Sequence, residues 1–223
     1  MLHEELKANY LHSSGIRSLL KGSGISLLDD FLDNWEMVKS FNEKYYSVPY
    51  PKIVLCGINP GKNGAGKTGI PFLDFLSLSK LLDGVSSKSE ERSAQFFYEI
   101  VNEIGAEEFY RTFYVTNISW IGYSEVDKCT NRVKNKNYYD LPNPAKKFVI
   151  EMFKKEMQAI NPTTIISMSQ EVNETIKELY GNSSVEISQT LNHPFFCSIE
   201  SNKVEQKKKY MKLLSTYIKA RKE

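Results

Sequence analysis

The chain is 223 residues long, which fits one folded domain with a substantial hydrophobic core. Hydrophobic residues make up 41% of it and charged residues 25%, as in an ordinary soluble globular protein. No run of about 18 apolar residues occurs, so we expect no transmembrane helix and no membrane partner. The formal net charge of +2 does not by itself indicate a partner.

The N-terminal segment contains acids and lacks the apolar stretch of a signal peptide, so we expect a cytoplasmic protein. Cys56, Cys129 and Cys197 are far apart and odd in number. They form no paired-cysteine or cysteine–histidine pattern typical of a zinc or iron–sulfur site. We therefore expect no metal and no cofactor.

Basic residues gather in the second half of the chain. They form two groups, the first at Lys128, Arg132, Lys134, Lys136, Lys146, Lys147, Lys154 and Lys155, and the second at Lys207, Lys208, Lys209, Lys212, Lys219, Arg221 and Lys222. A one-sided basic surface would suit a nucleic-acid backbone, because lysine and arginine neutralise phosphates. For the C-terminal group, the solvated faces of a helix are an equal alternative.

The first fifty residues are predicted to be mainly helical. Apolar residues recur at helical spacing through residues 25–46, and Pro49 and Pro51 end this helix. The continuous apolar run at 52–58 then has the length of a strand that is buried on both faces, as in a parallel sheet.

The rest of the chain alternates between helices and short apolar strands. In chain order, we expect a helix at 72–82, a helix at 92–104, a strand at 112–117, a helix at 143–160, a strand at 163–168, a helix at 169–180, a strand at 184–188, a loop at 189–200 and a helix at 203–219. This alternation predicts an α/β fold with three layers (αβα) around a central four-stranded, mainly parallel sheet. We expect one domain over residues 1–223, with a helical N-terminal part at 1–50 and a core at 51–223.

Three polar residues, Asn59, Asn117 and His193, each follow a predicted strand. In folds of this class, ligands bind at the carboxyl ends of the parallel strands. We therefore expect these side chains to meet at one rim of the sheet.

Residues 52–72 satisfy two incompatible motifs. Gly61, Gly66, Lys67 and Thr68 match the phosphate-binding loop of nucleotide hydrolases. Such a loop opens a helix, whereas Pro71 would remove an early helical hydrogen bond. No predicted strand ends in the aspartate that would hold magnesium. These two features argue against an NTPase that uses residues 61–68, which is kept as the less favoured alternative.

The second motif consists of GINPG at 57–61 and TGIPF at 68–72, and it resembles the first motif of the uracil-DNA glycosylase superfamily. The resemblance is greatest to the single-strand-selective monofunctional branch, with the mismatch-specific branch second. Two later segments, TNISWI at 116–121 and His193-Pro194, resemble the branch's other two motifs in the same order. The resemblance covers about residue 50 to the C-terminus and implies a uracil-DNA glycosylase-like fold.

The resemblance implies two catalytic residues. Asn59 corresponds to the residue that positions the attacking water. A carboxamide orients water without taking its proton, so departure of the base must lead the reaction. His193 corresponds to the histidine that stabilises negative charge on the uracil 2-oxygen. A turn asparagine and a loop histidine bonded to nearby backbone are the alternatives.

The resemblance also implies the residues that bind the flipped base. Asn117 offers a donor and an acceptor on one plane, which pairs with the uracil edge and refuses cytosine. Phe72 would stack on the base. The remaining predicted substrate-binding residues would let the backbone approach the base and the phosphate closely. They are Gly57, Ile58, Gly61 and Gly69. The alternatives for Asn117 and Phe72 are a turn cap and a core aromatic.

Two departures from the branch's pattern indicate a divergent, bacterial-type subfamily. Phe195 and Phe196 follow His193-Pro194 where a Ser-Pro pair is usual, so these rings are candidates for an apolar wedge in DNA or for core packing. Trp120 and Ile121 replace the usual Cys-Pro-Leu segment after Asn117.

The sequence therefore predicts a monofunctional DNA-repair glycosylase. It would flip uracil, or another deaminated base, out of DNA and hydrolyse the N-glycosidic bond by water attack. The expected partner is DNA containing such bases, and the expected oligomeric state is a monomer. The alternatives are the NTPase and a catalytically inactive nucleic-acid-binding homologue.

Overall fold

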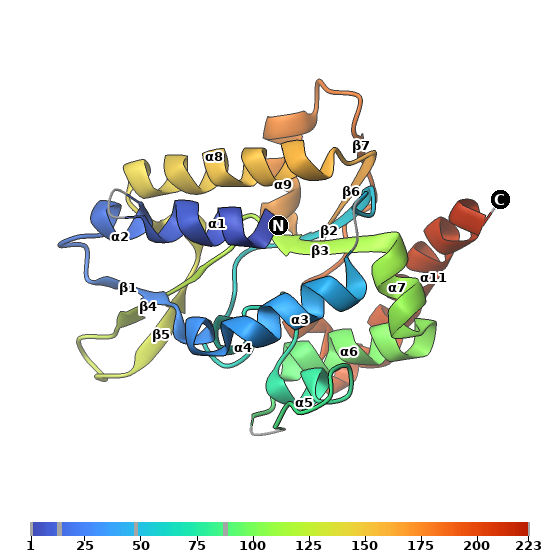
Figure 1. Cartoon of the computed structure of the whole chain (residues 1–223), viewed down its shortest axis with the longest axis horizontal. Coiled ribbons are helices and arrows are strands. Elements are labelled where there is room, and N and C mark those ends of the chain that lie inside the picture. Colours follow the sequence, from blue (N-terminus) through green and yellow to red (C-terminus); the bar gives the residue numbers. More distant parts are fainter. Residues whose placement is uncertain (1, 13–14, 47–48, 87–88, 223) are drawn as a thin grey trace.

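A four-stranded parallel sheet forms the centre of the computed structural model, which describes residues 2–12, 15–46, 49–86 and 89–222 (Figure 1). Its spatial order is β3-β2-β6-β7, with β2 at Ile53–Gly57, β3 at Phe113–Asn117, β6 at Thr164–Ser167 and β7 at Glu186–Ile187. The predicted central sheet is confirmed, although β7 is only two residues long.

Side chains of β2 alternate between two hydrophobic cores, one on each face of the sheet. Val54 and Cys56 pack in one core and Leu55 packs in the other. The first core is covered by α1 (Leu2–Leu11), α2 (Ile16–Leu19), α8 (Asn143–Ile160) and α9 (Gln170–Tyr180). The second is covered by α6 (Arg92–Ile104), α7 (Ala106–Thr112) and α11 (Glu200–Lys222), while α3 (Trp35–Tyr45) contributes to both. The predicted three-layer arrangement is therefore confirmed.

A second sheet was not predicted. It is antiparallel, in the order β1-β4-β5, with β1 at Ile25–Leu28, β4 at Gly122–Val126 and β5 at Val133–Lys136. The predicted helix over 25–46 is therefore wrong in its first part. Residues of β1 pair with β4, a 3-10 turn occupies Asp30–Asn34, and the helix starts only at Trp35. A short apolar run is compatible with the spacing of a helix or of a strand, and here pairing with the distant strand β4 makes it a strand.

The predicted helix at 72–82 is also largely wrong, because only α5 (Phe75–Leu78) forms there. Another short helix, α4 (Ala65–Thr68), precedes it. Between them the chain turns through left-handed backbone at Gly69 (φ 72°) and Phe72 (φ 59°), which ends any helix. The short helix α10 (Pro194–Cys197) lies inside the predicted loop at 189–200.

Most other predicted elements are confirmed. The helices α6 and α8 have the predicted bounds, and Ser169 caps α9 by accepting from the Val172 N–H at 3.2 Å. In the part of the chain that is described, no helix has both the length and the apolar character that a membrane span needs.

One buried acid makes the stability of the fold depend on pH. Burial raises the pKa of Glu156 to about 7, against 4.5 for an ordinary glutamate, although the hydroxyls of Tyr114 and Thr116 donate to its Oε1 at 3.0 and 2.9 Å. Between these values the folded protein keeps a proton that the unfolded chain has lost. The stabilisation is therefore complete below pH 4.5 and is lost as pH rises through 7.

Glu156→Gln should remove this pH dependence, because glutamine does not ionise. We expect the variant to gain stability relative to the wild type between pH 5 and pH 8, by on the order of 2 kcal/mol. Urea unfolding at both pH values measures the change. Glu151→Gln, at an exposed position of the same helix, is the control. Equal pH dependence in the wild type and in Glu156→Gln would contradict the assignment.

Candidate active site

The carboxyl ends of the parallel strands bring three of the predicted site residues to one rim. Gly57, at the end of β2, lies in register with Asn117 at the end of β3. The chain after β7 is joined to the end of β6, because the Leu191 N–H donates to the Ser167 carbonyl at 2.8 Å. His193 follows two residues later.

A cavity of about 170 Å³ lies at this rim. The predicted site residues that line it are Ile58, Asn59, Gly61, Phe72, Asn117 and His193. Segments far apart in the sequence therefore supply one cavity, as the strand-end argument predicted.

Asn117 forms the most enclosed polar part of this cavity. It is only 3% exposed, yet among the residues that the structure describes none forms a hydrogen bond with its side-chain amide. Both polar atoms of this amide stay open to solvent, because neither is among the fully buried unpaired atoms of the described residues. Such a group is suited to a ligand that completes its hydrogen bonds.

Phe72 is held in strained backbone beside Asn117. Its φ of 59° is rare for a bulky residue. The ring centroid lies 5.1 Å from that of Phe97 and 6.0 Å from that of His193. The Thr68 hydroxyl donates to the Leu73 carbonyl at 2.7 Å and so stabilises the turn that presents the ring.

Gly57 is needed because of these two side chains. A Cβ at this position would overlap both the Asn117 Oδ1 and the Phe72 ring. The glycine thus allows the amide and the ring to lie directly over the end of β2.

The His193 ring is held in one tautomer by its own backbone. Its Nδ1 accepts a hydrogen bond from the Phe195 N–H at 3.1 Å, and this caps α10. The lone pair on Nδ1 is therefore in use, so the proton of the neutral ring is on Nε2. Burial lowers the pKa of His193, and Glu171 opposes the shift only in part. At neutral pH the ring is an uncharged hydrogen-bond donor.

The loop that carries His193 is attached to the C-terminal helix. The hydroxyl of Tyr210, in α11, donates to the Asn192 carbonyl at 2.6 Å. The Asn192 amide donates to Gln206 Oε1 at 2.9 Å. These contacts hold the loop that carries His193 against α11.

The Asn59 side chain is braced against the second sheet. Its Oδ1 accepts from the Tyr138 N–H at 3.0 Å, and its Nδ2 donates to the carbonyls of Pro60 and Lys136 at 3.2 and 3.3 Å. Both donors of the amide are occupied, whereas the oxygen keeps a second lone pair. The orientation of the amide is therefore fixed.

Gly69 does not line this cavity. A Cβ there would meet Phe31 and Val38 in the core, and its left-handed φ of 72° favours glycine independently. Lys67, which the phosphate-binding motif would use, lies in α4, a helix of only four residues that ends at Thr68. No observation supports the NTPase alternative.

Several residues of the cavity were not predicted. Glu91 and Ser93 line it from the start of α6, and Asn135 and Asn137 line it from β5 and the segment that follows. The Glu91 carboxylate caps α6 by accepting from the backbone of Ser93 and Ala94. Nothing in the local sequence separates Glu91 from the neighbouring Glu90.

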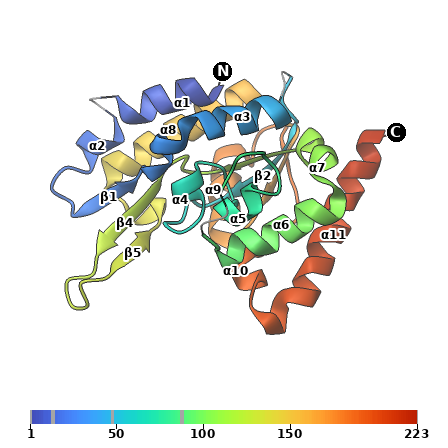
Figure 2. The same ribbon diagram turned by 60° about the horizontal axis from the view of Figure 1, so that its bottom comes forward.

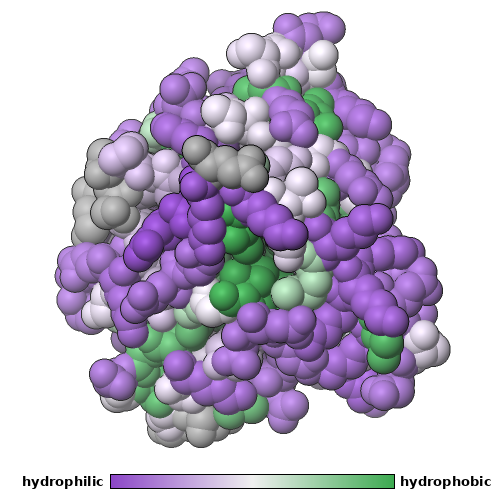
Figure 3. All heavy atoms as spheres, turned by 90° about the vertical axis from the view of Figure 1, so that its right-hand side faces the viewer, coloured by the Kyte–Doolittle hydropathy of each residue, from purple (hydrophilic) through white to green (hydrophobic). Residues whose placement is uncertain are grey.

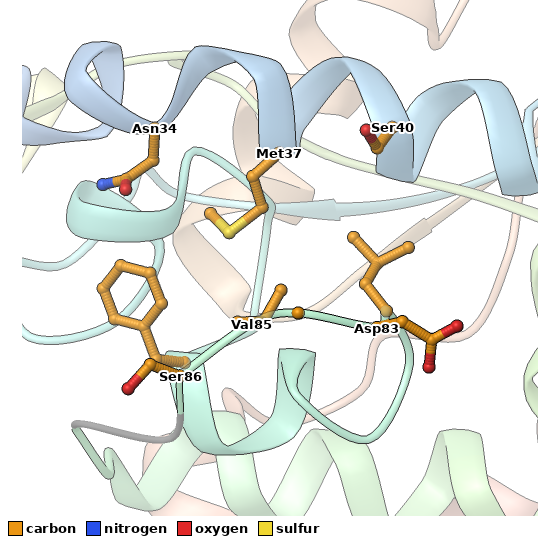
Figure 4. Close-up of a pocket in the computed structure, with 9 residues that line it drawn as sticks. Asn34, Met37, Ser40, Asp83, Val85 and Ser86 are labelled. Carbon is orange, nitrogen blue, oxygen red and sulfur yellow. The ribbon is translucent and has the colours of Figure 1, made fainter.

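A larger cavity, of about 440 Å³, lies away from the strand ends (Figure 4). Met37 of α3 points across it toward the loop with Val85. Among its described lining residues, Asp83 alone is ionisable. None of the predicted site residues lines it, so we assign the candidate site to the smaller cavity. In the described ranges, no group of three or more His, Cys, Asp or Glu side chains could hold a metal ion.

Comparison with known proteins identifies the family. The model of the uracil DNA glycosylase superfamily matches residues 43–217, which is most of the chain, and the chain therefore belongs to this superfamily. It is a protein of the DNA glycosylase class, hydrolases that act on DNA. The resemblance predicted from residues 57–72 is confirmed.

A solved structure supports the same assignment. The crystal structure of wild-type SMUG2 from Pedobacter heparinus is similar to this chain, with 26% sequence identity and a TM-score of 0.74. The match covers 99% of this chain and 96% of that one, in agreement with the predicted branch. No curated protein matches the chain.

Proposed function

We propose that this protein is a monofunctional uracil-DNA glycosylase, which hydrolyses the bond between uracil and deoxyribose in DNA. The observation that carries the proposal is the buried Asn117 amide, which has no partner among the described residues and lines a cavity beside an aromatic ring. One planar amide that both donates and accepts matches the uracil edge, whose 4-carbonyl accepts and whose ring N–H donates. Cytosine presents the opposite pattern.

The base enters the cavity by leaving the DNA stack. Its face lies against the Phe72 ring, which offers stacking without sequence preference. Asn117 then forms the edge hydrogen bonds. Because Gly57 has no side chain, the end of β2 leaves room for this arrangement.

His193 acts on the departing base. As the glycosidic bond breaks, its electron pair moves onto the uracil ring and negative charge grows on the 2-oxygen. The Nε2–H of the neutral imidazole donates to this oxygen, a contact that strengthens as charge develops. The occupied Nδ1 supports this role, since it keeps the proton on Nε2.

Asn59 acts on the water. The second lone pair of its fixed amide oxygen accepts a hydrogen bond from the water that adds to the sugar carbon. An amide does not remove the proton at this stage, so the water attacks a sugar that already carries positive charge. The added water loses a proton to solvent and the uracil anion takes one up, so the products are free uracil and an abasic site with an intact backbone.

A single assay tests the proposal. The protein is incubated with a uracil-containing oligonucleotide in EDTA and without nucleotide, and the products are treated with alkali. We expect alkali-labile abasic sites, no strand cleavage before alkali, and no product from the matching cytosine oligonucleotide. A catalytically inactive binding protein would yield no abasic sites, and an NTPase would show magnesium-dependent nucleotide hydrolysis that Lys67→Ala removes.

Gly57→Ala should lower uracil excision by roughly 10- to 100-fold, the scale expected when reacting groups are displaced by about 1 Å. The added methyl group displaces Asn117 and Phe72 from the cavity floor. Single-turnover kinetics measure the loss. Circular dichroism and binding to an abasic-site oligonucleotide show whether the fold and the DNA contacts persist. Full activity in a folded Gly57→Ala protein would place the base elsewhere.

A further inference from the structure

The β4–β5 hairpin supplies Asn135 to the lining of the cavity. It extends away from the rest of the molecule (Figure 2). Its strands pair from Tyr123 opposite Lys136 to Val126 opposite Val133. The connecting turn is ordered, since the Asp127 carboxylate accepts from the N–H groups of Cys129 and Thr130 at 2.9 and 2.8 Å. The hairpin is therefore a defined arm.

The base of this arm is fixed to the loop that carries Asn59. The Lys62 N–H donates to Asn135 Oδ1 at 3.0 Å, and the Lys62 ammonium donates to the Val133 carbonyl. The Asn59 amide bonds to the Lys136 carbonyl at 3.3 Å. These contacts set the position of the arm relative to Asn59, and so relative to the cavity that Asn59 lines.

The arm carries two cations with no acidic partner. Its acids are already paired, Glu125 with Lys136 at 3.1 Å and Asp127 with Lys134. Lys128 and Arg132 are exposed and form no ion pair with any residue in the described ranges. The tip of the hairpin is therefore positively charged.

The C-terminal helix differs. Most of its cations are paired with acids of α6, α7 or α11 itself, and these cations are Lys203, Lys207, Lys209, Arg221 and Lys222. The face that carries α7 and α11 is mostly hydrophilic, with apolar areas at its centre and toward its lower left (Figure 3). The first predicted basic group is divided between the hairpin and α8, which carries Lys146, Lys147, Lys154 and Lys155. Lys208, Lys212 and Lys219 of α11 also form no ion pair with any described residue, so pairing alone does not choose a surface. The hairpin is favoured because it is attached to the loop that carries Asn59.

Exposed apolar side chains lie on the hairpin and on α10, two elements that both supply residues to the cavity. On the hairpin, Val126 is 52% exposed and Val133 is 46% exposed, directly opposite each other. On α10, Phe195 is 56% exposed and lines the cavity, and Phe196 is 45% exposed. Of these four side chains, Phe195 lines the cavity itself, so exposed apolar surface borders the cavity at α10.

We propose that the β4–β5 hairpin is a DNA-binding arm that holds the strand next to the extruded nucleotide. Lys128 and Arg132 neutralise its phosphates, and the two valines contact its sugars. The inference rests on the proposed function for the identity of the ligand. Charge complementarity and the attachment of the arm to the Asn59 loop favour DNA over a second copy of the chain. Contacts to phosphate carry no sequence information, which suits an enzyme that must act in any sequence context.

The test compares two variants that remove equal charge. Lys128→Ala/Arg132→Ala changes the arm, and Lys208→Ala/Lys212→Ala changes two exposed, unpaired lysines of α11. Affinity for a duplex with a stable abasic-site analogue is measured between about 50 and 200 mM salt. We expect the arm variant to bind roughly tenfold more weakly and to lower the slope of log K against log salt by about 1.8. The α11 variant should change little, and Lys128→Arg/Arg132→Lys should retain wild-type binding.

The outcomes separate the two proposals. Equal affinity and slope in the arm and α11 variants overturn the arm, even if the wild type excises uracil. In another outcome the wild type excises no uracil, and of the two variants only the arm variant binds abasic DNA more weakly. The arm is then supported and the proposed function fails. A third outcome would assign the arm to a second copy of the chain and overturn the inference. In that outcome the wild type is a dimer that Val126→Ser/Val133→Ser dissociates, and loss of Lys128 and Arg132 leaves DNA affinity unaltered.

Discussion

Replacing His193 with alanine should slow single-turnover uracil excision by roughly 100-fold or more, the scale of one lost group that stabilises charge in the transition state. The Nε2–H is needed only as the base departs, so DNA affinity should change little. Rapid-quench measurement of abasic-site formation gives the rate. His12→Ala removes a histidine that does not line the cavity and serves as the control.

A structural role for His193 predicts a different result. The ring also caps α10 through Nδ1, and alanine removes that cap as well. His193→Asn separates the roles, because asparagine is a good helix cap but has no donor at the position of Nε2. We expect this variant to be as slow as the alanine variant. Recovery of the rate with asparagine would show that capping, and not donation to the base, was lost.

The same histidine sets the acid side of the pH profile. Because burial lowers the pKa of His193, the neutral ring persists below pH 6.5, the ordinary value for histidine. Protonation at Nδ1 would break the hydrogen bond from Phe195. Excision should therefore stay constant from neutral pH to 6.5 and fall only at lower pH, and His193→Asn should lack this fall.

The parts of this protein that were predictable are those with local signals. The apolar run of β2 has no polar break, and α6 and α8 repeat apolar residues at helical spacing. Parallel strands end at one edge, so Asn59, Asn117 and His193 were expected together, and all three line one cavity.

The parts that were missed depend on distant partners. All of β5 apart from Lys136 is exposed, so it lacks the apolar pattern that marks a strand, and it forms because β4 lies beside it. The segment Ile25–Leu28 looks helical until β4 is present to pair with it. Glu91 and Asn137 reach the cavity only through the packing of α6 and of the second sheet. No spacing rule within one segment contains that information.

Replacing Asn59 with alanine should also lower single-turnover excision by roughly 100-fold or more, because the water then lacks the acceptor that holds it in line with the sugar. The variant should still fold, as measured by circular dichroism, and should still bind DNA, since its phosphate contacts lie elsewhere.

Alanine also removes the hydrogen bonds to Lys136 and Tyr138, so loss of bracing is a competing explanation for a slow Asn59→Ala variant. Lys62→Ala is the matched control, because it removes another hydrogen bond between this loop and the hairpin, the one from the Lys62 ammonium to the Val133 carbonyl, at a residue that does not line the cavity. We expect it to cost less than roughly tenfold in rate, since no group that touches the water is lost. If Lys62→Ala is as slow as Asn59→Ala, the amide acts through the position of the hairpin and not through the water. A normal rate in Asn59→Ala would remove this residue from the mechanism altogether.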